Sequence, residues 1–186
     1  MSEARPDVLR ESISWSARPH RGFAERLALR YPRLLASFSR AIWRMPRRSR
    51  LRRAVLRRAL ERGWEGMNRA DLDVGLALYH EDVESAFEPG FASLGFADTR
   101  GRDERRRMLM QVYDETRELR FEPEELIYVD DDRLLVIGRM KGGGLSSGAP
   151  FDSEWANLMT ISGGFVIRDQ VMRSHREALE AVGLSE

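Results

Sequence analysis

The chain has 186 residues, 42% of them hydrophobic, which is enough for one domain of ordinary size with a sizeable core. It has no cysteine, so disulfides, thiolate nucleophiles and cysteine-ligated metals are excluded. The formal net charge of +1 conceals an asymmetry, because residues 1–70 hold 18 Arg and 6 acidic residues whereas residues 71–186 hold 13 basic and 24 acidic residues. We expect the two parts to neutralise each other within the molecule; a nucleic-acid or membrane arm is the alternative.

The N-terminal segment gives few signals. Residues 1–20 are rich in Ser, Arg and Pro and their apolar positions have no period, which predicts little regular structure. The first twelve residues lack the apolar core of a secretory signal, and no run in the chain approaches the roughly 20 apolar residues that span a bilayer. Together with the absence of cysteine, these features predict a cytoplasmic location.

A helical stripe follows, with apolar residues at steps of three and four from Phe23 to Met45. Pro32 is expected to open a second helix and Pro46 to end it. We expect the stripe to pack on the domain's own surface or at a subunit interface, with a membrane interface as the alternative. Nine arginines between residues 40 and 58 could contact anionic lipid or nucleic-acid phosphates, although we favour packing because Pro32 interrupts the helix.

The rest of the chain predicts helices followed by hairpin-linked strands. Ser49 is a candidate N-cap for a helix that ends near residues 68–71, and a short helix is expected over 72–79. A first strand over 83–87, a Gly-rich loop over 89–100 and a helix from Asp103 come next. Strands are expected over 119–129, 133–140, 151–161 and 165–173, with Gly142–Gly144 interrupting the ladder, before a terminal helical turn over 175–182. This order predicts an α+β domain.

Several segments carry a resemblance to a known family. LERGWEGMNRADLD (60–73), LALYHEDVE (76–84), RGRD (100–103), FEPEEL (121–126) and EALEAVGL (177–184) resemble the SnoaL-like family of the nuclear transport factor two-like superfamily. The resemblance implies a curved, mostly antiparallel sheet wrapped around helices as a cone over residues 51–186, behind a basic helical extension over 1–50. It also implies a ligand pocket and a homodimer formed through the convex sheet face. Members include polyketide cyclases, isomerases, dehydratases and epoxide hydrolases, and others that bind ligands or partners without known chemistry.

Two residues are candidates for catalysis. Strand alternation places Phe151, Trp155 and Asn157 on one face, which in the family lines the pocket. Asn157 matches the position where the isomerases carry a protonated Asp, and its amide could donate to a developing oxyanion; the alternative is that it satisfies a neighbouring polar group. Glu88 resembles the isomerases' general base, since a carboxylate in an apolar cone has a raised pKa; the alternative is an exposed Glu at a strand end.

The remaining pocket residues are apolar. We expect Trp64, Tyr113, Trp155, Met159 and Met172 to contact a ligand, with ordinary core packing as the alternative. Three scattered His and no Cys predict neither a metal nor a cofactor. The expected ligand is therefore a small apolar molecule, such as an apolar carbonyl or polyketide-like compound. Either an acid–base enzyme of the isomerase, cyclase or dehydratase type or a non-catalytic ligand-binding or interaction domain would fit.

Overall fold

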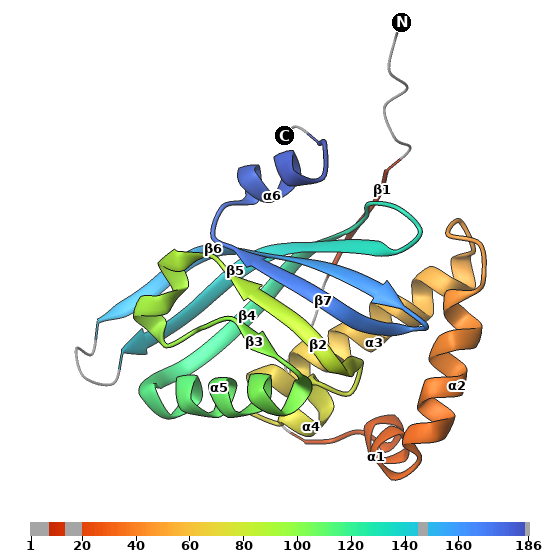
Figure 1. The fold of residues 1–186 in the computed structure, drawn as a ribbon, viewed down its shortest axis with the longest axis horizontal. Helices are drawn as coiled ribbons and strands as arrows, with labels where there is room; N and C mark the ends of the chain where they lie inside the picture. Colours follow the sequence, from red (N-terminus) through yellow and green to blue (C-terminus); the bar gives the residue numbers. More distant parts are fainter. Residues whose placement is uncertain (1–7, 14–19, 145–148, 185–186) are drawn as a thin grey trace, which may run out of the picture.

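The computed structural model describes residues 8–13, 20–144 and 149–184. These residues form an α+β fold in which a curved, unclosed and mostly antiparallel sheet of seven strands wraps around helices (Figure 1). The fold class expected from the sequence is confirmed.

The strands lie in the order β1-β4-β5-β6-β7-β2-β3. Four long, sequential strands make its centre, and β2 adds to β7 in parallel, whereas every other neighbouring pair is antiparallel. The bounds are β1 Leu9–Ser12, β2 Tyr79–Phe87, β3 Thr99–Arg100, β4 Thr116–Tyr128, β5 Arg133–Gly144, β6 Pro150–Ser162 and β7 Phe165–Met172.

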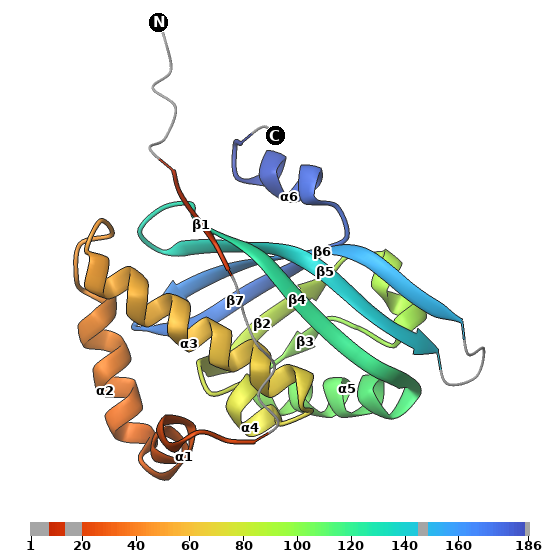
Figure 2. The same cartoon turned by 180° about the vertical axis from the view of Figure 1, so that it is seen from behind.

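The helices lie on two sides of this sheet. In Figures 1 and 2, α3, α4 and α5 lie against the concave face, whereas α6 lies on the opposite side. The helix bounds are α1 Phe23–Arg30, α2 Pro32–Trp43, α3 Arg50–Asn68, α4 Leu72–Gly75, α5 Arg102–Glu115 and α6 His175–Ala181. A 3₁₀ turn, Pro89–Leu94, connects β2 to β3.

Helix starts follow the local signals. Pro32 is the first residue of α2, as expected, because its missing N–H is not needed there. The Ser49 side chain accepts a hydrogen bond from the backbone of Arg52 and so caps α3, which is also as expected. From there α3 runs along the cone with Leu60, Trp64 and Met67 buried on one stripe.

One expectation about the strands is wrong and another is met only in part. Leu9–Ser12 forms β1, which pairs with residues 125–128 of β4, although this part of the chain was expected to lack structure; the rest of 1–20, apart from residues 8, 13 and 20, lies outside the described residues. Gly142–Gly144 was expected to interrupt the ladder, and this is only partly so: the register with β4 shifts at Gly142, between Arg117 and Arg120, whereas the pairing of β5 with β6 continues through Gly142 and Gly143. A Cβ on Gly142 would lie 2.8 Å from the Phe151 ring, so glycine is required there for close packing.

The stripe on α1 and α2 packs on the domain only in part, because Leu35 and Ile42 of α2 face α3 and the β6–β7 hairpin whereas most of the stripe is exposed. The exposed residues of the stripe are Phe23, Leu27, Tyr31, Leu34 and Phe38. Ile42, in contrast, is buried. A subunit or membrane interface remains a prediction for the exposed part.

Charged side chains connect the N-terminal segment to the rest of the molecule. Arg21 forms an ion pair with Asp71 at 2.6 Å. Arg52 is buried over the Trp43 ring at 4.2 Å and donates to the carbonyl of Asp131 at 2.9 Å. Burial lowers the pKa of Arg52. These contacts agree with neutralisation within the molecule, whereas binding of nucleic acid or membrane stays a prediction.

Candidate functional site

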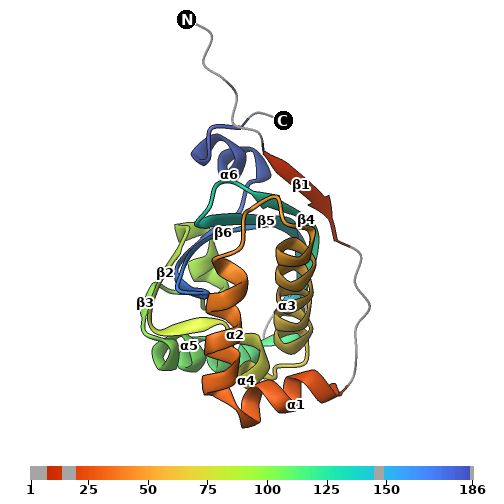
Figure 3. The same cartoon turned by 90° about the vertical axis from the view of Figure 1, so that its right-hand side faces the viewer.

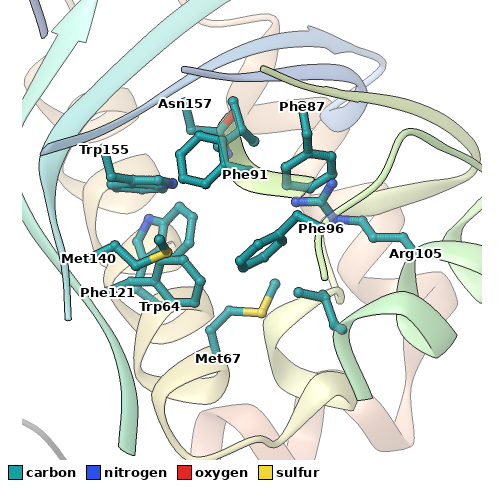
Figure 4. A pocket seen from close by; sticks show the side chains of 12 residues that line it. Trp64, Met67, Phe87, Phe91, Phe96, Arg105, Phe121, Met140, Trp155 and Asn157 are labelled. Carbon is teal, nitrogen blue, oxygen red and sulfur yellow. The ribbon is translucent and has the colours of Figure 1, made fainter. Parts of the chain in front are cut away.

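A narrow, mostly apolar cavity lies inside the cone, between α3, α5 and the concave face of the sheet (Figure 4). Its volume of about 20 Å³ is room for roughly one water molecule. Its lining side chains are aromatic or aliphatic except for Arg105 and Asn157: Trp64, Met67, Phe87, Phe91, Phe96, Arg105, Leu109, Phe121, Met140, Trp155, Asn157 and Val171.

Aromatic rings make two walls of the cavity. On one side, the Trp64 and Trp155 rings meet edge to face at 4.6 Å between centroids, and Phe121 lies 5.6 Å from Trp155. On the other side, Phe91 and Phe96 come from the irregular connection between β2 and β3 and lie 5.8 Å apart. Figure 4 shows the labelled rings arranged around the central space.

A buried ion pair lies at one side of the cavity. Arg105 of α5 contacts Asp169 of β7 with N–O distances of 2.8 and 3.1 Å, and Ser85 of β2 donates its hydroxyl proton to the same carboxylate at 2.5 Å. The guanidinium carbon of Arg105 also lies 4.8 Å from the centroid of the Tyr79 ring and 5.4 Å from that of Phe87. Arg105 lines the cavity, whereas Asp169 lies behind it, so the carboxylate orients the guanidinium toward the cavity.

Burial dominates the electrostatics of this cluster. It raises the pKa of the Asp169 carboxyl despite the opposing charge of Arg105. It also raises the pKa of Tyr79 to about 12. Burial is the largest single effect on the pKa of Arg105 and lowers it, but Asp169 and Tyr79 together outweigh burial and raise that pKa, so Arg105 is a permanent cation at the cavity wall.

Asn157 is the second polar group of the lining, and it is fully buried. Its amide interacts with the side chains of Tyr79 and Asp169, and this interaction partly opposes the burial that raises the pKa of both groups. Even so, neither its Oδ1 nor its Nδ2 makes a hydrogen bond of acceptable geometry with any described residue, and the same holds for Nε of Arg105. A buried amide with no partner costs about 1–3 kcal/mol, and an imperfectly paired one bears part of that cost, which a polar group bound in the cavity would relieve.

The structure brings most of the residues expected at the site to the concave face. Trp64, Trp155 and Asn157 line the cavity, and Met159 lines a neighbouring cavity of about 30 Å³. Tyr113 is close by but does not line it, because its hydroxyl donates to the carbonyl of Met67 at 2.6 Å.

Two expected site residues lie elsewhere. The Glu88 carboxylate accepts the backbone N–H of Arg173 at 2.8 Å, beyond the end of β7, and does not line the cavity, so it is not placed to act as a base there. Met172 faces the convex side, where it packs with Leu179 of α6, because Val171 takes the inward-facing position of β7. Neither residue is therefore positioned as the sequence predicted.

Sequence reasoning missed Arg105 and Asp169, although both carried a signal. Arg105, Met108, Leu109 and Val112 follow the spacing of a buried helix face, and all four are buried. Asp169 has the same strand parity as Val171, which lines the cavity.

No group of three or more His, Asp or Glu side chains within the described residues is arranged to hold a metal ion. In the same residues, no helix combines the length and the apolar character needed to cross a bilayer.

Comparisons with known proteins agree on the fold. The chain is similar to an NTF2-like protein of unknown function from Burkholderia pseudomallei, with 20% identity, a TM-score of 0.57, and coverage of 68% of this chain and 94% of that one. It is similar to TerC co-crystallised with polyporic acid, with 21% identity, a TM-score of 0.56, and coverage of 68% and 96%. It is also similar to a putative SnoaL-like polyketide cyclase from Jannaschia sp. CCS1, with 20% identity, a TM-score of 0.51, and coverage of 72% and 92%.

A search of curated proteins found no match. The model of the SnoaL-like domain, by contrast, matches residues 60–168, which is more than half of the chain and includes both polar groups of the cavity. The chain therefore belongs to the SnoaL-like domain family.

Proposed function

We propose that the cone binds a small, mostly apolar molecule that carries a carbonyl or similar oxygen, as a polyketide-like compound does. The observation that carries this proposal is the Asn157 amide, which is buried in an aromatic cavity and, despite its proximity to Tyr79 and Asp169, makes no hydrogen bond of acceptable geometry with a described residue. The proposed ligand would place its oxygen at Asn157 and Arg105 and its rings or chains among the aromatic walls.

The cavity is too small for such a ligand as it stands, so binding requires side chains to move. Phe91 and Phe96 are the candidates, because they come from the connection between β2 and β3 and not from a central strand. Arg173 holds the start of this connection, where its backbone N–H donates to the Glu88 carboxylate at 2.8 Å and its guanidinium donates to the carbonyl of Gly90 at 3.3 Å, so the movement has to take place beyond Gly90. We propose that this connection moves outward to admit the ligand.

Binding is better supported than turnover. Arg105 and Asn157 together would stabilise negative charge on a ligand oxygen, which is what an isomerase or cyclase of the acid–base type needs. Such an enzyme also needs a proton acceptor, and no Asp, Glu or His is found among the described residues that line the cavity. We therefore place ligand binding first and catalysis second.

Two of the similar structures favour a ligand of this class. TerC was crystallised with polyporic acid, and the Jannaschia protein is described as a putative polyketide cyclase. At about 20% identity these likenesses establish a shared fold, so they support the ligand class only as part of the proposal.

The test compares 1,4-naphthoquinone with naphthalene, which have the same fused rings with and without carbonyl oxygens. The chain has no cysteine for a quinone to alkylate. The wild-type chain should bind the quinone at least about fivefold more tightly, as expected for one gained hydrogen bond. In Asn157→Leu this preference should disappear, whereas the free energy of unfolding should stay the same or rise because two unpaired buried atoms are removed.

The stability measurement separates the two interpretations of Asn157. If Asn157 only satisfies its neighbours, Asn157→Leu should lose at least 1 kcal/mol and should not change the ratio of affinities. Equal binding of both compounds by the wild-type chain would contradict the proposal. Formation of a new product from the quinone would favour catalysis over binding.

A second candidate function is contact with an anionic membrane surface through α1 and α2. It is supported by five exposed apolar side chains on these helices, Phe23, Leu27, Tyr31, Leu34 and Phe38, in a segment rich in arginine. Co-sedimentation with phosphatidylserine vesicles that fails with phosphatidylcholine and weakens at high salt would support it. Replacement of Phe23 and Leu34 by Ser should abolish that binding, and unchanged binding would count against the proposal.

A further inference from the structure

A second, much larger apolar chamber lies outside the cone cavity. It has a volume of about 430 Å³, against about 20 Å³ for the cavity at Asn157. Its walls come from α2, from the first half of α3 and from the β6–β7 hairpin, and Figure 3 looks onto α2 and α3 side by side. Apolar side chains make most of the lining: Leu35, Phe38, Ile42, Val55, Leu60 and Ile161. This volume is in the usual range for small-molecule sites.

The chamber exists because α2 is fixed against the hairpin. Gly164 has a positive φ of 84°, and a Cβ at this position would lie 2.5 Å from the backbone carbonyl carbon of Ser39. Only glycine therefore allows the hairpin turn to approach α2 so closely. One turn further along α2, Ile42 is buried. The N-terminal extension thus forms one wall of a space that the cone alone would leave open.

The polar groups of the lining are mainly cationic. Arg58 and Arg62 lie one turn apart on α3, and both are half-buried. Arg58 has a partner, Glu61, at 2.9 Å. Arg62 makes no ion pair or hydrogen bond within the described residues, and none of those lining the chamber is acidic. A half-buried guanidinium without an anion, beside an apolar space, is complementary to a carboxylate that carries an apolar chain.

We propose that this chamber binds a medium- or long-chain carboxylate of the fatty-acid type, with its acyl chain between α2, α3 and the hairpin and its carboxylate on Arg62. The site does not depend on the function proposed for the Asn157 cavity, because the two share no lining residue. The two are connected indirectly. A third cavity of about 30 Å³ shares Leu60 and Val166 with the chamber and Trp64 and Met67 with the cavity at Asn157.

The test is a binding titration of the full chain with saturated fatty acids of 8 to 16 carbons, each compared with the alcohol of the same length, below their micellar concentrations. Affinity should rise roughly three- to fourfold per added methylene until the chamber is full. The acid should bind more tightly than the alcohol, and Arg62→Gln should remove that preference without removing the dependence on chain length.

Two matched variants locate the site. Val55→Trp fills the chamber and should weaken acid binding at least tenfold, whereas Ala41→Trp adds the same side chain on the exposed side of α2 and should leave it unchanged. If Val55→Trp does not fold, the loss of acid preference in Arg62→Gln decides the question, since that substitution removes no contact seen in the described residues.

Several results would overturn the proposal. They are no binding at any chain length, equal affinity for acid and alcohol, and acid binding that survives in Val55→Trp. A concentration-dependent dimer that Val55→Trp converts to monomer would show instead that a second copy of the chain occupies the chamber. Equal loss of binding in Ala41→Trp and Val55→Trp would place the site on the outer face of α2.

Discussion

Removal of the Arg105 side-chain charge should destabilise the protein strongly. In Arg105→Met the aliphatic stem is retained, but the Asp169 carboxylate is left without its ionic partner at a position where its side chain is 0% exposed. Breaking one side of a buried pair costs about 3–5 kcal/mol. In a chain of this size that loss should lower Tm by about 10 °C.

The neighbouring Arg106 provides a matched control. It forms an ion pair of 2.7 Å with Asp73, but the two side chains are 42% and 46% exposed. Arg106→Met therefore removes the same charge from the same helix at a cost of about 0–1 kcal/mol. The distance between the charges is similar in the two pairs, so burial is the variable that the comparison isolates.

The cost of Arg105→Met should also depend on pH. Burial raises the pKa of Asp169 above its ordinary value of 3.8, so the folded state binds this proton more tightly than the unfolded state. Loss of the Arg105 charge should raise that pKa further. The deficit of the variant relative to wild type should then be largest near neutral pH and shrink as pH falls through the raised pKa toward 3.8.

Urea denaturation of both variants from pH 7 to pH 4.5 measures these differences directly. Equal, small losses in Arg105→Met and Arg106→Met would refute the claim that the Arg105–Asp169 pair is desolvated. A deficit in Arg105→Met that does not change with pH would refute the assignment of the cost to the Asp169 carboxylate.

Three further substitutions test other contacts. Asn68→Ala removes two side-chain hydrogen bonds to the backbone of Phe121, of 2.8 and 2.7 Å, and should cost about 2–3 kcal/mol in urea denaturation, with Asn68→Asp in between because it keeps the acceptor. Ser49→Ala removes the cap of α3 and should cost about 1 kcal/mol, whereas Ser49→Gly should cost only a few tenths. The hydrogen bond from Arg21 lowers the pKa of Asp71, which adds stability above pH 3.8 that is lost as pH falls. In Arg21→Gln the free energy of unfolding should therefore change less between pH 5 and pH 2 than in the wild-type chain. In 1 M salt, which screens the pair, the two proteins should differ less.

Local signals predicted much of the fold. The proline that opens α2, the serine that caps α3 and the alternation along β6 each act over a few residues, so the sequence alone was sufficient to identify them. The alternation also placed Trp155 and Asn157 correctly on the concave face.

The errors concern long-range contacts. The sequence Leu9–Ser12 shows no apolar period, so it does not predict a strand. These residues form β1 because they pair with β4, more than 110 residues later in the chain. Glu88 was misplaced because its carboxylate accepts a hydrogen bond from the backbone of Arg173. These two residues are far apart in the sequence, so local patterns do not predict the contact. Asp169 was passed over because a charged residue is rarely expected in a core, and its burial depends on Arg105 arriving from another element.

The pairing of β1 with β4 has a consequence for the order of folding. Residues 9–12 are synthesised before their partners at 125–128, which follow on the order of ten seconds later at usual rates of synthesis. β1 is therefore among the last of the described strands to pair in the sheet. Until β1 pairs with β4, the N-terminal extension is not held at its β1 end. The cone can therefore fold before α2 takes its place beside α3.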